Sequence, residues 1–479
     1  MTSGGRAPLH PAERKLLVAL AIQLCFLPWA LGTMHRWSQM TSLAISAAGL
    51  AVALRPRIYE GELVGNGQSF RLEPWLKLVR FPIFWLGLAL LAYVVLQALN
   101  PSWSYRQSAI QWWLVRVKEV PWLPAGVAAP FSQSNPWRGG IVYASAWLTV
   151  CSVWVGVTRR RTLRILLGII VANGVCLGGL LAIQRLTRNS RIPWPLTSWT
   201  PHDLTASFIY ENHTGAYLAL TVFCAIGLAI WFLDHGRRSM AKSTPAGVFA
   251  IGALCMMTAV IFTLSRGAIL AMAISLMLLA AWYFLRSRFQ PGVPGGNPTL
   301  KITILAIFAV FVLGAAHYLD FSQIYSRWEG IVTLQGNEPG VHSRVLARSA
   351  AVAMWKNHGI RGVGVGCFRY LFPENVQRYP EIYDHGHLFW EHAHCDWLEV
   401  PIEMGLIGDL LILAGMSWWM FFYLRHRILW SVLAVPILLG CLQTTIHAGF
   451  DFPFQCPAIL TTWCVLLTVA GKWAELDGN

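Results

Sequence analysis

The residues LIGDLLILAGMSWWMFFYL, at positions 406–424, indicate the fold class of this chain. The run contains one charged residue, Asp409, and a helix of roughly 20 apolar residues is long enough to cross the hydrocarbon core of a membrane. Similar apolar runs recur from Leu16 to the end of the chain. The sequence therefore predicts an all-α polytopic membrane protein, with residues 1–479 forming a single membrane domain.

The composition agrees with a membrane protein. The 479 residues are 56% hydrophobic and 12% charged, with a mean hydropathy of +0.51, whereas soluble domains carry about 25% charged residues. The net charge of +15 comes mostly from short basic clusters between apolar runs. Orientation in the membrane and contact with anionic membrane lipids explain such clusters better than nucleic acid does.

Twelve membrane spans are predicted from the apolar runs. They cover residues 16–34, 40–54, 81–99, 140–157, 163–183, 214–233, 247–264, 267–285, 301–319, 406–424, 429–446 and 455–471. With the N-terminus in the cytoplasm, every even-numbered connection is cytoplasmic, and each one carries lysine or arginine. The positive-inside rule therefore predicts that both termini are cytoplasmic.

The opposite, outer face then receives the longest connections. A loop at 100–139 is rich in tryptophan and proline, and a large segment at 320–405 separates spans nine and ten. Helical spacing of apolar residues over 343–357 predicts a helix within this segment. Gly362, Gly364 and Gly366 are typical of a tight turn, because no strand–helix context for a nucleotide loop follows them. Cys367 and Cys395 lie on this face and could pair.

Titratable and polar side chains gather on the same outer face. They begin span six, lead into span ten and follow span eleven. The members of this set are Asn212, His213, His392, His394, Asp396, Glu399, His447 and Asp451. Such a cluster on one face of a membrane protein predicts an active site, although His447 and Asp451 could instead simply end span eleven.

His394 is the predicted catalytic base. A histidine titrates near pH 6.5 in water, so its neutral form can take a proton from a hydroxyl group. The stretch HAHCDWLEVPIEMGLIG, at 392–408, also places His392, Asp396, Glu399 and Glu403 at spacings of one helix turn. That shared face, which excludes His394, could orient the base, bind acceptor hydroxyls or face solvent.

Three arginines are candidates for binding a diphosphate. Arg266 lies between two apolar runs, where a charge is costly unless it is paired or faces water. Arg344 and Arg348 lie one helix turn apart in the large outer segment. A guanidinium fork suits a diphosphate and needs no metal, whereas snorkelling for Arg266 and a solvated helix face for the other two remain alternatives. The sequence shows no metal-type spacing of cysteine and histidine.

The chain resembles the O-antigen ligase and O-antigen polymerase superfamily of bacterial membrane glycosyltransferases over approximately residues 205–465. Arg266 is followed four residues later by Leu270, as in the ligases. His394, Gly405 and Gly408 match the spacing of a second ligase motif, in which Cys395 replaces the usual polar residue.

The resemblance implies a GT-C-type fold in the bacterial inner membrane, with 320–405 as a periplasmic loop region. Such enzymes move a glycan from undecaprenyl diphosphate to an acceptor, such as lipid A core, without a metal or cofactor. It also implies that His394 deprotonates the acceptor hydroxyl while Arg266 and Arg344 hold the diphosphate. A polymerase extending glycan repeats and a transferase acting on protein hydroxyls share these motifs.

A polysaccharide or lipid transporter is an alternative from another class. Transporters of this size are typically built from inverted repeats with ionisable residues near the middle of the membrane. This chain shows no internal repeat and concentrates its polar residues at one membrane edge. The sequence therefore favours an enzyme.

Overall fold

A computed structural model describes residues 9–59, 70–188, 204–238, 243–289, 339–383 and 389–476. Its helices are α1 (Pro11–Trp29), α2 (Arg36–Ala53), α3 (Pro74–Val79), α4 (Pro82–Leu99), α5 (Pro136–Gly156), α6 (Arg160–Thr187), α7 (Glu211–Arg238), α8 (Ala246–Phe262), α9 (Arg266–Phe289), α12 (Pro339–His358), α13 (Phe368–Val376), α14 (Asp396–Arg425), α15 (Ala434–His447) and α16 (Pro457–Glu475). Its strands are β1 (Arg57–Tyr59), β2 (Phe70–Leu72), β3 (Pro101–Gln107), β4 (Trp112–Arg116) and β5 (Gly126–Ala128).

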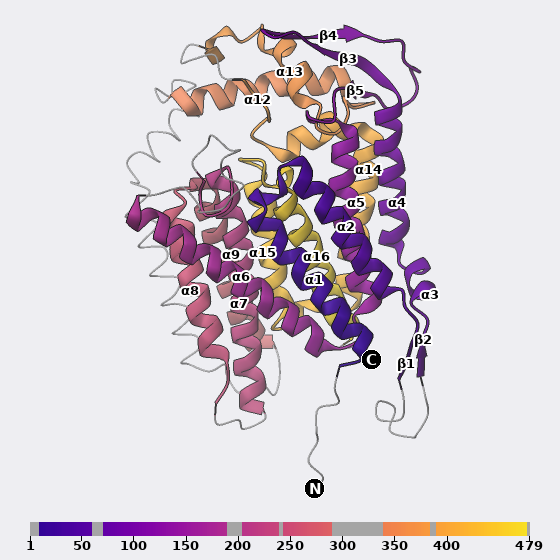
Figure 1. The fold of residues 1–479 in the computed structure, drawn as a ribbon. Helices are drawn as coiled ribbons and strands as arrows, with labels where there is room; N and C mark the ends of the chain where they lie inside the picture. The colour runs from indigo at the N-terminus through magenta and orange to yellow at the C-terminus, as the bar shows by residue number, and fades with distance from the viewer. Residues whose placement is uncertain are drawn as a thin grey trace.

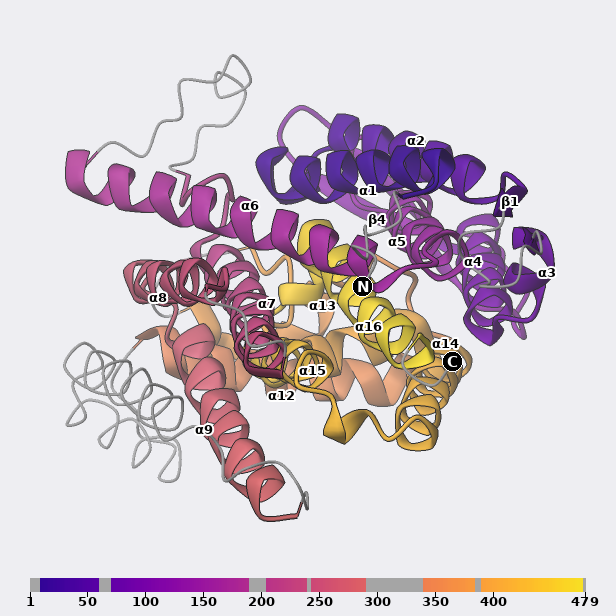
Figure 2. The same ribbon diagram turned by 90° about the horizontal axis from the view of Figure 1, so that it is seen from below.

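The long helices form a bundle that a smaller layer covers at one end (Figure 1). Seen from the opposite end, α7, α15 and α16 lie inside the bundle, while α4 and α9 lie toward its edge (Figure 2). Several helices begin with proline, including Pro82, Pro136 and Pro457. Proline suits this position because its ring presets the helical φ angle and the missing N–H has no partner within the helix anyway.

Helices occupy eleven of the twelve predicted spans, and the ninth, at 301–319, lies outside the described residues. Seven helices in the described part of the chain are long and apolar enough to cross a membrane: α4, α5, α6, α7, α9, α14 and α16. The helices α8 and α15 are apolar but shorter. A mostly helical membrane protein is thus confirmed, whereas the number of twelve spans stays a prediction.

The first two helices carry buried polar groups that hydrogen-bond to one another and to α5, although the Oε1 atom of Gln23 has no partner among the described residues. Gln23 of α1 donates hydrogen bonds to Ser42 of α2, at 2.7 Å, and to Ser145 of α5, at 3.2 Å. Ser145 also contacts the Ser46 hydroxyl at 2.9 Å. An unsatisfied polar group costs several kcal/mol in hydrocarbon, so this pairing makes the polar residues compatible with a membrane interior.

The covering layer contains β-structure that the all-α prediction missed. In the loop at 100–139, β3 pairs antiparallel with β4 and parallel with β5. Alternate side chains such as Trp103, Tyr105 and Trp112 pack against the buried side chains of α12 and α13. This second core makes the outer layer a folded unit, and α12 confirms the helix predicted at 343–357.

The helix predicted to begin at residue 406 begins earlier, at Asp396, and is interrupted where the prediction placed its start. Gly405 has φ +64° and ψ 178°, which breaks the helical path inside α14. The carbonyls freed by the break accept hydrogen bonds from the glycine turn, Ile402 from Val363 at 3.0 Å and Glu403 from Gly364 at 3.1 Å. The predicted tight turn is confirmed, and its backbone N–H groups bind the carbonyls that the kink leaves without partners in α14.

Replacing Gly405 with alanine should destabilise the protein by about 3 kcal/mol or more. An added Cβ would lie 2.5 Å from the Gly362 nitrogen and 2.6 Å from the Arg361 carbonyl carbon, and only glycine tolerates these backbone angles. Thermal unfolding of the detergent-solubilised protein measures the loss. Gly179→Ala in α6 is the matched control, because an added Cβ there meets nothing within 4 Å. Equal melting temperatures for the two variants would contradict the prediction.

Candidate active site

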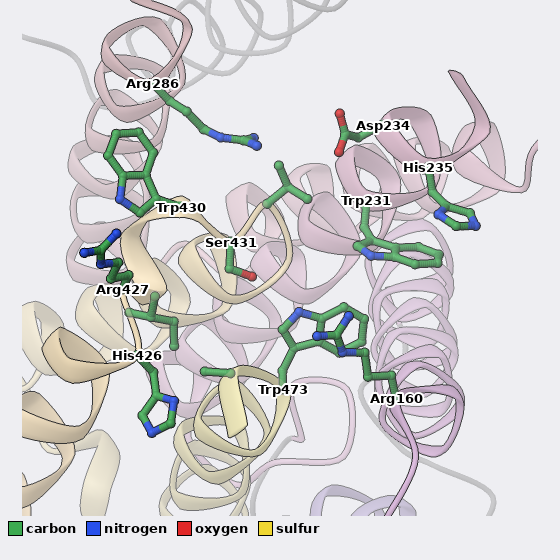
Figure 3. A pocket seen from close by; sticks show the side chains of 13 residues that line it. Arg160, Trp231, Asp234, His235, Arg286, His426, Arg427, Trp430, Ser431 and Trp473 are labelled. Carbon is green, nitrogen blue, oxygen red and sulfur yellow. The ribbon is translucent and has the colours of Figure 1, made fainter. Parts of the chain in front are cut away.

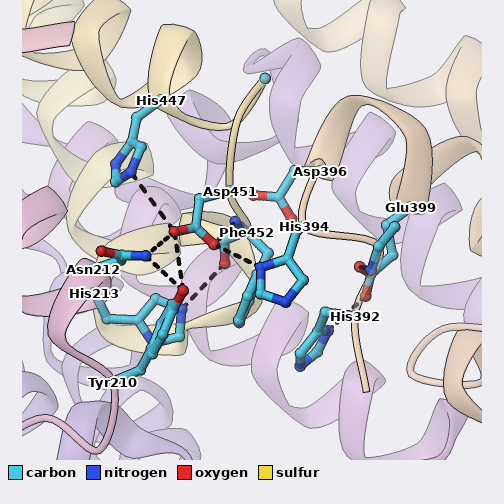
Figure 4. Close-up of polar contacts among 12 residues, drawn as sticks. Tyr210, Asn212, His213, His392, His394, Asp396, Glu399, His447, Asp451 and Phe452 are labelled. Carbon is cyan, nitrogen blue, oxygen red and sulfur yellow. Dashed lines mark hydrogen bonds and ion pairs between the residues drawn. The ribbon is translucent and has the colours of Figure 1, made fainter. Parts of the chain in front are cut away.

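His394 lies in the connection just before α14, next to Ala393, which is buried in the core of the covering layer. Figure 4 shows its side chain among the polar residues around it. Its backbone has φ +50°, an uncommon left-handed conformation for a non-glycine residue. Edge-on ring contacts with Trp390 and Phe452, at centroid distances of 5.4 and 4.9 Å, surround the imidazole. The side chain remains 21% exposed, so a substrate can reach it.

A carboxylate faces one nitrogen of this imidazole. The His394 Nδ1 atom lies 3.5 Å from Oδ1 of Asp451, which follows α15 (Figure 4). At this distance the two atoms form an ion-pair contact rather than a hydrogen bond of good geometry. A carboxylate facing Nδ1 favours the proton on that nitrogen and leaves Nε2, on the far side of the ring, as the basic nitrogen. This arrangement is suited to removing a proton from a hydroxyl group.

Asp451 is the centre of the polar cluster and is itself buried. Its Oδ2 atom accepts hydrogen bonds from the Asn212 amide and, at 3.3 Å, from the Tyr210 hydroxyl. Burial would raise the pKa of Asp451, but the close contact with His394 and the charges of the nearby histidines outweigh it and lower the pKa to about 2. Asp451 is therefore an anion at neutral pH.

Two buried histidines complete the surroundings of this anion. The Nε2 atom of His447, at the end of α15, lies 3.9 Å from Asp451 Oδ2. Within the described part of the chain, neither ring nitrogen of His447 has a hydrogen-bond partner. His213, near the start of α7, contacts the Phe452 carbonyl through Nε2 at 3.3 Å. His447 thus both ends its helix and faces the site.

A second histidine–carboxylate pair shapes the loop that carries His394. The Nδ1 atom of His392 lies 2.7 Å from Oε1 of Glu399, and the Ala393 N–H donates to Oε2 at 2.7 Å. Burial lowers the pKa of His392, but the Glu399 carboxylate more than compensates, so the net shift is upward. His392 precedes α14, so the expectation that it shares a helix face with Glu399 is wrong, although the two residues are in contact.

Phe452 joins the two halves of the site. Its ring stacks on His392 at a centroid distance of 4.4 Å and on Tyr210 at 5.1 Å. Neither Phe452 nor Tyr210 was identified from the sequence. Tyr210 stands two residues before Asn212 in the polar run Tyr-Glu-Asn-His, which was the available signal, whereas the aromatic character of Phe452 is common in this chain.

Asp396 forms its hydrogen bonds with backbone groups and not with the histidine side chains. Its Oδ2 atom accepts from the Phe454 N–H at 2.8 Å, and its own N–H donates to the Ala448 carbonyl at 2.9 Å. These bonds join the first turn of α14 to the connection between α15 and α16. The connection carries Asp451, so Asp396 helps to hold Asp451 opposite His394.

The three arginines occupy different places around the cluster. The Nη2 atom of Arg348 donates to the His394 carbonyl at 3.4 Å and to the Gly449 carbonyl at 3.2 Å. Arg344, one turn earlier in α12, is exposed. It lies close enough to Tyr210 for an electrostatic interaction between its guanidinium and the hydroxyl group. Arg266 is exposed at the start of α9, where an added Cβ on the next residue, Gly267, would lie 2.8 Å from His447 Nε2.

The structure thus brings the sequence-predicted residues into one region, where they form a buried polar centre and a set of exposed cations beside it. His394, Asp451, His447 and Asn212 form the polar centre, and Arg266 and Arg344 are the exposed cations near it. Among the described residues, no group of three or more histidine, cysteine, aspartate or glutamate side chains is arranged to hold a metal ion. Cys367 and Cys395 are both free thiols.

Comparison with known proteins finds a family match over part of the chain. No curated relative matches the chain. Residues 251–413, which include Arg266, Arg344, Arg348 and His394, match the family model described as O-antigen ligase. This match confirms the resemblance of the chain to the O-antigen ligase superfamily.

Proposed function

We propose that this chain is a glycosyltransferase that moves a glycan from undecaprenyl diphosphate to an acceptor hydroxyl on the periplasmic face of the bacterial inner membrane. The observation that carries the proposal is the contact between His394 Nδ1 and the Asp451 carboxylate within the covered end of an apolar helix bundle. The family match supports an O-antigen ligase-family membrane enzyme, and a lipid-linked glycan is the donor we propose on that basis.

The proposed reaction needs one base and one cationic site. The Nε2 atom of His394 takes the proton of the acceptor hydroxyl, and the oxygen attacks the anomeric carbon of the lipid-linked glycan. The bond between that carbon and the diphosphate oxygen breaks with inversion, and the electron pair leaves with undecaprenyl diphosphate. Asp451 stabilises the imidazolium that forms, while arginines neutralise the charge that builds on the diphosphate.

The arginines have separate roles in this proposal. Arg266 and Arg344 are exposed and can turn toward a diphosphate, so they form the clamp. Arg348 donates to the carbonyls of His394 and Gly449, and therefore holds the base loop against α12. A guanidinium binds two phosphate oxygens at once through parallel hydrogen bonds. Such binding can neutralise the charge of the diphosphate without a metal ion.

Arg266→Lys should reduce transfer by roughly 10- to 100-fold, because a point charge cannot replace the two parallel hydrogen bonds of a guanidinium. The measurement is transfer from undecaprenyl diphosphate-linked glycan by the purified protein. Arg106→Lys is the matched control, since Arg106 is an exposed arginine of β3. Full transfer by Arg266→Lys would contradict the clamp assignment.

Deleting the gene and analysing the glycans of the cell tests the function itself. Loss of glycan from lipid A core would support the ligase, accumulation of single glycan repeats would support a polymerase, and unmodified glycoprotein would support a protein transferase. Complementation with wild-type chain and with Arg106→Lys should restore the glycan. An unchanged glycan profile in the deletion strain would overturn the proposal.

A further inference from the structure

A second polar region lies at the end of the bundle opposite His394. It is a cavity of about 440 Å³ between the ends of α6, α7, α9, α14 and α16, and we call it the basal cavity. Asn212 at the active site and Trp231 in the basal cavity belong to the same helix, α7. The helix rise between them is roughly 28 Å, about the thickness of a bilayer's hydrocarbon core.

The basal cavity is rich in positive charge. Arg160, Arg286 and Arg427 line it, and Asp234 is the one carboxylate among its described lining residues (Figure 3). Three arginines and one aspartate give these described lining residues a formal charge of +2. Charge of this sign, concentrated in a cavity, favours an anionic ligand.

The local backbone explains only part of this charge. Arg286 lies in the last turn of α9, where a cation complements the helix dipole, whereas Arg427 lies two residues beyond the end of α14. Arg160 is the first residue of α6, where the dipole disfavours a cation. Its guanidinium stacks over Trp473 at 5.1 Å, which holds it at the cavity rather than in open water.

The rest of the lining suits the interface between water and lipid. Trp231, Trp430 and Trp473 line the basal cavity, and tryptophan is enriched at the headgroup level of membranes. Beside the cavity, Leu285, Leu424 and Leu429 are each more than half exposed. An acyl chain would cover such side chains, whereas a free phosphate ion would not.

We propose that the basal cavity binds the phosphate of an anionic phospholipid headgroup, with the acyl chains lying along the exposed leucines of α9 and α14. Arg286 contacts the phosphate oxygens from α9, Arg427 turns toward them from the loop that follows α14, and the indole rings contact the glycerol. Basic pockets between membrane helices bind anionic headgroups in this way. The site is independent of the transferase chemistry at the other end of the bundle.

Native mass spectrometry of the full chain in mild detergent tests this site. The protein is incubated with phosphatidylglycerol or with phosphatidylcholine, and the retained lipid is counted. We expect retention of phosphatidylglycerol over phosphatidylcholine, and roughly tenfold or greater weakening in both Arg286→Gln and Arg427→Gln. Arg55→Gln, an exposed arginine outside the cavity, is the matched control and should bind like wild type.

Competition with inorganic phosphate distinguishes a site for the phospholipid headgroup from a site for free phosphate. Displacement of phosphatidylglycerol only at high millimolar phosphate supports the lipid headgroup. Binding of inorganic phosphate without preference for phosphatidylglycerol would overturn the lipid assignment. Equal retention of phosphatidylglycerol by wild type and both arginine variants, with circular dichroism confirming that all are folded, would overturn the site.

Discussion

His394→Ala should reduce glycan transfer by roughly 10²- to 10⁴-fold, the usual contribution of a general base. The loss follows from the geometry, because Nδ1 faces the Asp451 carboxylate at 3.5 Å and Nε2 is the nitrogen left to accept the acceptor's proton. The measurement is transfer in vitro from undecaprenyl diphosphate-linked glycan. Donor binding should be retained, since the proposed clamp residues Arg266 and Arg344 are unchanged.

A matched control separates this effect from a general loss of fold. His358 is a half-buried histidine at the end of α12, on the same outer layer but outside the cluster. His358→Ala should transfer within about twofold of wild type, as expected for a group without a chemical role. Near-wild-type transfer by His394→Ala would remove His394 from the base role.

Asp451→Asn should cost roughly 10²- to 10⁴-fold in transfer, because an amide neither holds the proton on Nδ1 nor stabilises the imidazolium. The split between kcat and KM tests the positioning role more sharply than the overall rate. Because Asp451 acts on the imidazole and not on the acceptor, kcat should fall while the KM for the acceptor stays within about twofold of wild type. A rise in KM that accounts for the whole loss would indicate that Asp451 has only a structural role.

The wild-type pH dependence of stability follows from the lowered pKa of Asp451. The pKa of Asp451 is about 2 in the folded state and near 4 in the unfolded chain. The ionised carboxylate therefore contributes its full stabilisation above the unfolded pKa, and this contribution disappears as the pH falls toward 2. Between pH 5 and 9 the carboxylate stays ionised. Glu381→Gln, which changes an exposed glutamate of the outer layer, is the matched control and should leave the pH profile of stability unchanged.

The helices were predictable from the sequence because an apolar run must bury its backbone polar groups within its own helix. The strands were not predicted, although Trp103, Tyr105, Trp112 and Leu114 alternate as half-buried strands do. Short strands in a long loop give a weak local signal, and their pairing depends on the core formed with α12 and α13.

Part of the candidate site was predictable because it, too, produces a signal within a short segment of sequence. A polar residue at the end of an apolar run is conspicuous, which identified His394, Asp451 and Arg266 on one face. The pairing of His394 with Asp451 joins two segments that are distant in sequence, so no spacing rule could reveal it. Phe452 and Tyr210 resemble many other aromatic residues in the chain, and only their contacts distinguish them.

The sequence by itself determined that this protein is an apolar helical membrane protein with a polar cluster at one end, because hydropathy and charge are properties of short segments. Only the tertiary structure decided which carboxylate faces His394, that Arg348 holds backbone carbonyls, and that the start of α14 bends at Gly405 to pair with the glycine turn. These features depend on distances between segments, which packing sets and local composition does not.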